Sequence, residues 1–153
     1  MSDLKPLLER HPFFAELTDS DLQLIVSCAK NVRFRAGVHL IREGDPANEF
    51  FLIRTGQVAL EIFAPGRGAI DLQTVGPGEV IGYSWLFPPH IWQFSARTLE
   101  DVRALSIHGT CLRDKCDEDP RLGYRLMKRF AQVILQRLQA TRLQLLDLYG
   151  KPT

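Results

Sequence analysis

The chain has 153 residues, of which 45% are hydrophobic, so its size and composition fit a single domain with one packed core. A formal net charge of +1 gives no electrostatic reason to expect a nucleic-acid or membrane surface, because such partners are usually signalled by a large excess of Lys and Arg. No stretch approaches about 18 consecutive apolar residues, and the first residues lack the apolar core of a secretory signal. We therefore expect a cytoplasmic protein, and the odd number of cysteines, 3, favours a reducing compartment over a disulfide scaffold.

The N-terminal part, residues 1–30, has the pattern of a helical region. Thr18 and Asp21 have the spacing of a capping box, and the apolar residues after them recur at helical intervals: Leu22, Ile25, Val26 and Ala29. The preceding residues 11–14, His-Pro-Phe-Phe, are expected to form an extended anchor that packs on the domain. A peptide that docks on a partner is the alternative interpretation of this anchor.

From Asn31 onward, short alternating runs are separated by turns rich in glycine. The runs predict strands at residues 32–34, 39–41, 50–53, 58–62, 69–74 and 102–107. Strands this short, joined by turns this regular, indicate a small antiparallel barrel or roll.

The stretch from Gly78 to Thr98 is the strongest functional candidate. It is predicted to form a strand that stops at Gly82, a brief helical run ended by Pro88-Pro89, and an extended return that starts at Trp92. The first N–H groups of a helix have no internal partners, so a one-turn helix that opens at a glycine forms a cradle for a small anion. In this sequence, however, the cradle is lined with aromatic residues, which include both tryptophans of the chain.

Spaced motifs connect these elements: Phe34-x-x-Gly37, Ile41-x-Glu43-Gly44-Asp45, Phe50-x-x-Ile53-x-x-Gly56-x-Val58, Gly78-Glu79-x-x-Gly82 and Glu100-Asp101. This framework resembles the cyclic nucleotide-binding domain of the catabolite-activator superfamily over nearly the whole chain. The resemblance implies one α+β domain, residues 1–153, in which an antiparallel, jelly-roll-like β-roll (residues 31–108) lies between N-terminal helices and C-terminal helices (residues 109–150). It also implies that the segment after Gly82 corresponds to a phosphate-binding cassette.

The chain departs from that family at the two contacts that recognise the nucleotide. Cyclic-nucleotide binders of the family usually place a glutamate for the ribose after the cassette glycine and an arginine for the phosphate before the return strand, where this chain has Tyr83 and Trp92. Neither replacement supplies a cation, so we expect weak or no binding of cyclic nucleotide. The two rings either fill the vacated pocket as core or line an apolar ligand site. The candidate ligand-binding residues are Gly82, Tyr83, Ser84, Trp85, Leu86, Trp92 and Arg97, although strand alternation favours an outer-face position for Arg97.

Two helices are predicted after the last strand, the first over residues 109–117 and the second from Pro120 to about residue 149, led by the capping residue Asp119. One apolar stripe of the long helix is expected to face the roll: Leu122, Leu126, Phe130 and Val133. Another keeps the 3-4 spacing of a coiled-coil seam and predicts a two-fold homodimer: Met127, Ala131, Ile134, Leu138, Thr141, Leu145 and Leu148. The resemblance implies that a polar residue in mid-helix reaches the partner's ligand pocket, for which Arg137 and Thr141 are the candidates.

Other chemistry has less support in the sequence. Cys111 and Cys116 lie about 140° apart around a helix, which favours buried structural thiols over a metal or redox site. No two of the four histidines stand at i and i+4, and no motif of a catalytic site is present, so we expect no cofactor, no metal and no enzyme activity. Only 3 residues follow the long helix, so direct reading of DNA is not expected.

The sequence therefore predicts a regulatory or sensor module in which a small ligand in the roll is signalled through the C-terminal helix. A module that binds no ligand and docks on a partner protein is the first alternative. A redox or haem sensor that uses Cys111, Cys116 and the histidines is the second.

Overall fold

The structure is a computed structural model that describes residues 4–150. At its N-terminal end lie α1 (Lys5–Arg10), the 3-10 helix η1 (Pro12–Phe14) and α2 (Asp19–Val26). The predicted capping box is confirmed, since the Thr18 hydroxyl accepts from the Asp21 amide and the Asp21 carboxylate accepts from the Thr18 amide. Residues 11–14 are not extended as predicted, because the His11 ring accepts a hydrogen bond from the Phe13 amide and tightens the chain into a turn. The two phenylalanines are buried, as expected of an anchor.

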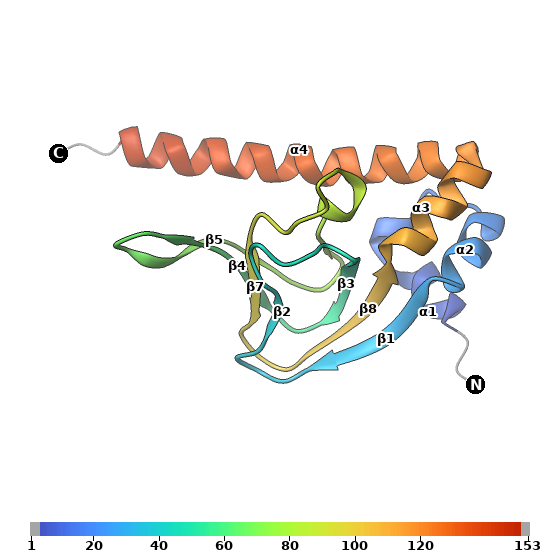
Figure 1. Ribbon diagram of the computed structural model, residues 1–153, viewed down its shortest axis with the longest axis horizontal. Helices are drawn as coiled ribbons and strands as arrows, with labels where there is room; N and C mark the ends of the chain where they lie inside the picture. The colour runs from blue at the N-terminus through green and yellow to red at the C-terminus, as the bar shows by residue number, and fades with distance from the viewer. Residues whose placement is uncertain (1–3, 151–153) are drawn as a thin grey trace.

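The strands within the described residues form two antiparallel sheets of four strands each. The first sheet has the order β1 (Ala29–Phe34), β8 (Val102–His108), β3 (Glu49–Thr55) and β6 (Val80–Ile81). The second has the order β2 (His39–Ile41), β7 (Ser95–Thr98), β4 (Val58–Ala64) and β5 (Gly68–Val75). Together with the helices they confirm the predicted α+β architecture, in which the sheets face each other as a roll (Figure 1).

Two separate apolar layers hold the roll together. One fills the space between the sheets and includes Phe51 and Ile53 from β3 and Leu60 from β4. The other lies between the first sheet and the helices and includes Phe50 and Leu52 from β3. Because side chains alternate along a strand, β3 contributes to both layers, which explains its continuous run of buried residues.

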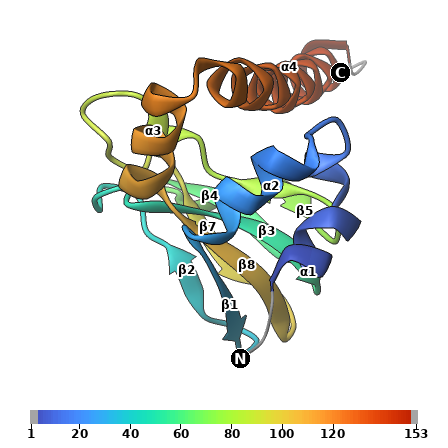
Figure 2. The same cartoon turned by 90° about the vertical axis from the view of Figure 1, so that its right-hand side faces the viewer.

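The C-terminal helices are α3 (Gly109–Glu118) and α4 (Pro120–Gly150). Asp119 caps α4 as predicted, since its carboxylate accepts from the amides of Arg121 and Leu122. Figure 1 shows α4 running across the top of the roll and past it, and Figure 2 shows the helix nearly end-on above the sheets. The predicted inner stripe is buried through Leu122, Leu126 and Phe130, whereas the predicted seam is open, with Leu138 46% and Leu148 71% exposed.

One expectation about the cysteines is wrong. Cys111 is not a free thiol but is disulfide-bonded to Cys28, 83 residues away in the sequence. The pairing of β1 with β8 brings the two together, since Ala29 lies opposite Ile107 and the His108 amide donates to the Cys28 carbonyl. An odd number of cysteines therefore does not argue against a disulfide here, because two pair and Cys116 remains free. None of the helices within residues 4–150 combines the length and the hydropathy that crossing a bilayer requires.

Candidate functional site

Gly82 is the residue at which the chain turns from β6 into the predicted cassette. It follows β6 directly and has a φ of 103°, in a region that residues with a side chain rarely adopt. A Cβ atom at this position would lie 2.4 Å from Cη2 and 2.6 Å from Cζ3 of Trp92. The indole therefore rests directly on the backbone of Gly82, where a ligand cradled by this turn would approach.

Trp92 is part of the apolar core of the roll. Its side chain is 5% exposed and belongs to the layer between the sheets, where Phe94 lies edge-on to it with 6.0 Å between ring centroids. Of the two interpretations left open by the sequence, the structure shows Trp92 packed as core.

The rest of the cassette faces the other apolar layer. The 3-10 helix η2 (Ser84–Leu86) directs Trp85 away from the roll interior into the layer under the helices, where it is fully buried and stacks on Phe50 at 4.9 Å. Tyr83 and Leu86 pack partly against this same layer, and Ser84 is buried. The structure therefore does not bring the predicted ligand-binding residues together around one cavity, because Trp92 and Trp85 belong to opposite sides of the first sheet.

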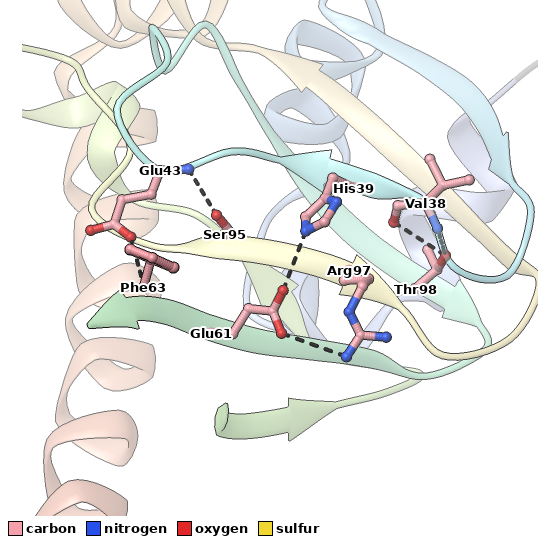
Figure 3. Close-up of polar contacts among 8 residues, drawn as sticks. All are labelled: Val38, His39, Glu43, Glu61, Phe63, Ser95, Arg97 and Thr98. Atoms are coloured by element: carbon pink, nitrogen blue, oxygen red, sulfur yellow. Dashed lines mark hydrogen bonds and ion pairs between the residues drawn. The ribbon is translucent and has the colours of Figure 1, made fainter. Parts of the chain in front are cut away.

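Arg97 lies on the outer face of the second sheet, as alternation predicted, and not in the cradle. Its neighbour Ala96 is the residue that points into the roll. Figure 3 shows Arg97 on β7 and His39 on β2 both directed at the carboxylate of Glu61 on β4. Arg97 Nη2 lies 3.5 Å from Glu61 Oε2, and His39 Nε2 lies 3.2 Å from Oε1. Glu61 is only 6% exposed, so the two bases supply the partners that a buried carboxylate needs.

The two candidates on α4 differ in orientation. Arg137 points at the roll, and its Nη2 donates to the carbonyl of Val80, two residues before Gly82. Thr141 is exposed, and its hydroxyl donates back to the Arg137 carbonyl one turn earlier. Arg137 is thus the mid-helix residue in contact with the roll, while Thr141 lies on the open seam.

A second arginine, which the sequence did not single out, reaches the cassette from α3. Arg113 donates from Nη1 to the carbonyl of Trp85 and from Nη2 to the hydroxyl of Thr110. Its position four residues after the start of α3 is that of an ordinary exposed helix residue, so only the packing of α3 on the cassette reveals the contact. Phe130 of α4 adds an apolar contact, with its ring 5.4 Å from that of Trp85.

The described residues contain no group of three or more His, Cys, Asp and Glu side chains placed to hold a metal ion. His108 caps α3, since its Nδ1 accepts from the Cys111 amide. Burial raises the pKa of the Cys116 thiol to about 11, with the carboxylates of Asp117 and Asp119 acting in the same direction. Among the side chains that suggested a redox or haem site, Cys111 is disulfide-bonded, His108 caps a helix and Cys116 is a thiol with a raised pKa.

The sequence profile of the cyclic nucleotide-binding domain matches residues 31–119. A structure from Geobacter metallireducens, described as that of a cyclic nucleotide-binding protein, is 31% identical over 90% of this chain and 99% of its own, with a TM-score of 0.77. The N-terminal domain of a transcriptional regulator from Streptomyces coelicolor is 27% identical over 85% of this chain and 93% of its own, with a TM-score of 0.69.

The fold is also similar to that of the catabolite activator protein from Thermus thermophilus, which is 24% identical over 91% of this chain and 63% of its own, with a TM-score of 0.71. No curated protein matches the sequence. Cyclic nucleotide-binding domains are typically regulatory and not catalytic. The length of the profile match and the relative in Geobacter both show that the chain belongs to the cyclic nucleotide-binding domain family.

Proposed function

We propose that this domain is a homodimeric regulatory module whose nucleotide cradle is closed by its own Trp92 and whose signal passes between the cassette and α4. The observation that carries this proposal is the indole of Trp92 resting on the backbone of Gly82. A cyclic phosphate would need the same space, and the ring offers it no charge.

A cyclic nucleotide would meet Tyr83 and Trp92 in place of the two charged side chains expected of a nucleotide binder. Hydrogen bonds to charged groups contribute roughly 1.5–3 kcal/mol each, so the absence of the glutamate and the arginine costs about 3–6 kcal/mol. That loss corresponds to about two to four orders of magnitude in affinity. Displacement of a buried indole from its site adds a further cost.

Three contacts support a connection between the cassette and α4. Arg137 holds the carbonyl that precedes Gly82, Phe130 packs on Trp85, and Arg113 of the adjoining α3 holds the Trp85 carbonyl. A change in the cassette would therefore change the position in which α4 is held on the roll.

The exposed seam of α4 supports the homodimer. Met127, Leu138, Leu145 and Leu148 are each at least 38% exposed on one stripe, and two such stripes meeting about a two-fold axis would remove them from water. We expect a dimer in light scattering and a monomer for Leu138→Asp. Leu143→Asp is the matched control, because Leu143 is also exposed but lies about 140° around the helix from Leu138.

Calorimetric titration tests the closed cradle. We expect no heat with micromolar cyclic AMP or cyclic GMP for the native protein, and binding for the double variant Tyr83→Glu, Trp92→Arg, in which the two recognition side chains return. Each single variant should bind little, because a lone charge among aromatic rings is poorly solvated. Low-micromolar binding by the native protein would show that the indole leaves Gly82 readily and would refute the closed cradle.

A further inference from the structure

A cavity of about 500 Å³ lies where α4 crosses the turn between β5 and β6, outside the roll interior. The cavity is bounded by the roll, by η1 and by α4. The roll contributes Gln73, Thr74 and Glu79, η1 contributes Phe13, and α4 contributes Arg129, Val133, Gln136, Arg137 and Ala140. The volume is within the usual range of small-molecule sites, about 300–1,000 Å³. Because the walls come from α4 and the β5–β6 turn, this cavity is a different place from the cradle at Gly82.

Arg137 is the unusual group in this cavity. Burial lowers its pKa, which nearby Tyr83 and Glu79 partly offset. Nη2 donates to the Val80 carbonyl, but Nη1 is buried and forms no hydrogen bond with any residue in the described part of the chain. The guanidinium also forms no ion pair there, and the Glu79 carboxylate is turned toward the Gly76 amide at 2.5 Å.

A guanidinium that has lost water and has an Nη1 without a hydrogen-bond partner is costly, and the Glu79 charge offsets only part of that cost. The contact of Arg137 with the Val80 carbonyl places the guanidinium on the side of α4 that faces the roll. Nη1 has almost no accessible surface, so an anion in the cavity would reach it through a rotation of the guanidinium, accept from it and offset the cost.

The walls restrict the class of anion. Arg129 remains a cation, but Nε and Nη2 donate to the carbonyls of Phe13 and Pro12 and Nη1 donates to Gln132, so these donors are already engaged. The carboxylate of Glu79 lies close enough to act on Arg137 electrostatically, which disfavours a dianion such as phosphate. Phe13, Val133 and Ala140 provide apolar wall. The site thus suits one negative charge on a partly apolar body.

We propose that this cavity binds a small organic carboxylate, whose carboxylate group accepts from Nη1 of Arg137 and whose body packs against Phe13, Val133 and Ala140. The ligand would join α4 to the turn that leads into the cassette. This proposal does not depend on the closed cradle, since none of the contacts involves Trp92.

The test uses benzoate as the probe, benzamide as its neutral analogue of the same shape, and inorganic phosphate as the dianion. Binding is followed by the shifts of the Gly76 and Gly78 amide resonances in the 153-residue chain. We expect saturable shifts with benzoate, and binding at least tenfold weaker for benzamide and for phosphate, since a hydrogen bond to a charged group is worth roughly tenfold or more.

Two variants locate the anion on the chain. Arg137→Met should weaken benzoate binding at least tenfold, whereas Arg121→Met, an exposed arginine of the same helix that does not line the cavity, should leave it unchanged. Ala140→Phe keeps the guanidinium but fills the space, so it should abolish binding even if Arg137→Met fails to fold. No saturable shift at about 20 mM benzoate would overturn the proposal. So would equal binding of benzamide, tighter binding of phosphate, or unchanged binding in Ala140→Phe.

Discussion

Substitution of Gly82 by alanine is the most direct test of how the cradle is closed. At this position an added Cβ would meet two carbons of the Trp92 ring at 2.4 and 2.6 Å, on a backbone with a φ of 103°. Gly37 is the matched control, because its φ is 81° but nothing lies within 4 Å of an added Cβ. Gly37→Ala therefore measures backbone strain alone, and Gly82→Ala measures the strain together with the clash.

The expected magnitudes differ accordingly. Placing a residue with a side chain in the left-handed region costs about 1–2 kcal/mol, so this is the loss of unfolding free energy expected for Gly37→Ala. Overpacking in a dense core adds about 1–3 kcal/mol, and the indole is rigid, so Gly82→Ala should lose about 2–5 kcal/mol. In a domain of this size that loss lowers the melting temperature by roughly 5–20 °C.

Urea unfolding at one fixed protein concentration measures these losses, because association of the chain would make the apparent stability depend on concentration. Trp92→Phe completes the cycle, because the smaller ring withdraws the atoms that clash. The pair Gly82→Ala, Trp92→Phe should be less destabilised than the sum of the single variants by about 1–3 kcal/mol. Equal losses at the two glycines, or an additive double variant, would refute contact between the indole and Gly82.

Three further predictions concern titration and the disulfide. Burial lowers the pKa of His11 below 6.5, so the unfolded chain binds the extra proton more readily and stability should fall as pH drops below about 6.5. His11→Gln should reduce that slope in urea unfolding measured between pH 5 and 8. Cys28→Ser and Cys111→Ser should each lower the unfolding free energy by about 2–5 kcal/mol, because the bond closes a loop across 83 residues, and reduction of the native protein should produce the same loss. Cys116, with its pKa raised to about 11, should react slowly with iodoacetamide at pH 8 and faster as the pH rises toward that value.

Much of the roll could be predicted from the sequence because its turns demand glycine. Gly37, Gly44, Gly56, Gly78 and Gly82 all have positive φ, a conformation that other residues rarely adopt, so their spacing carries the framework of the fold. The strands between them followed from alternation. The outer-face position of Arg97 followed in the same way, since its neighbour Ala96 is buried in the roll.

The packing of the aromatic residues in the predicted cassette could not be predicted in the same way. Both faces of the first sheet are buried, so an apolar residue beside the sheet can enter either of the two apolar layers. The hydrophobic periodicity of the sequence does not decide between the two layers. The sequence therefore predicts one pocket for Trp85 and Trp92, whereas the two residues enter different layers. The bond between Cys28 and Cys111 was missed for a related reason, because spacing along one helix says nothing of a partner brought close by strand pairing.

In the proposed relay, Gly82 lies between two carbonyls that arginines of the C-terminal helices hold. Arg137 of α4 holds the Val80 carbonyl before it and Arg113 of α3 holds the Trp85 carbonyl after it. Each such bond is worth roughly 1.5–3 kcal/mol, so releasing both costs about 3–6 kcal/mol. About 5.5 kcal/mol is enough to move a two-state equilibrium from 1:99 to 99:1. A carboxylate on Nη1 would leave the bond from Nη2 in place, so the proposed ligand would strengthen the docked position of α4 on the roll. Arg137→Met removes that bond, so the ligand and the substitution should shift the equilibrium of the proposed dimer in opposite directions.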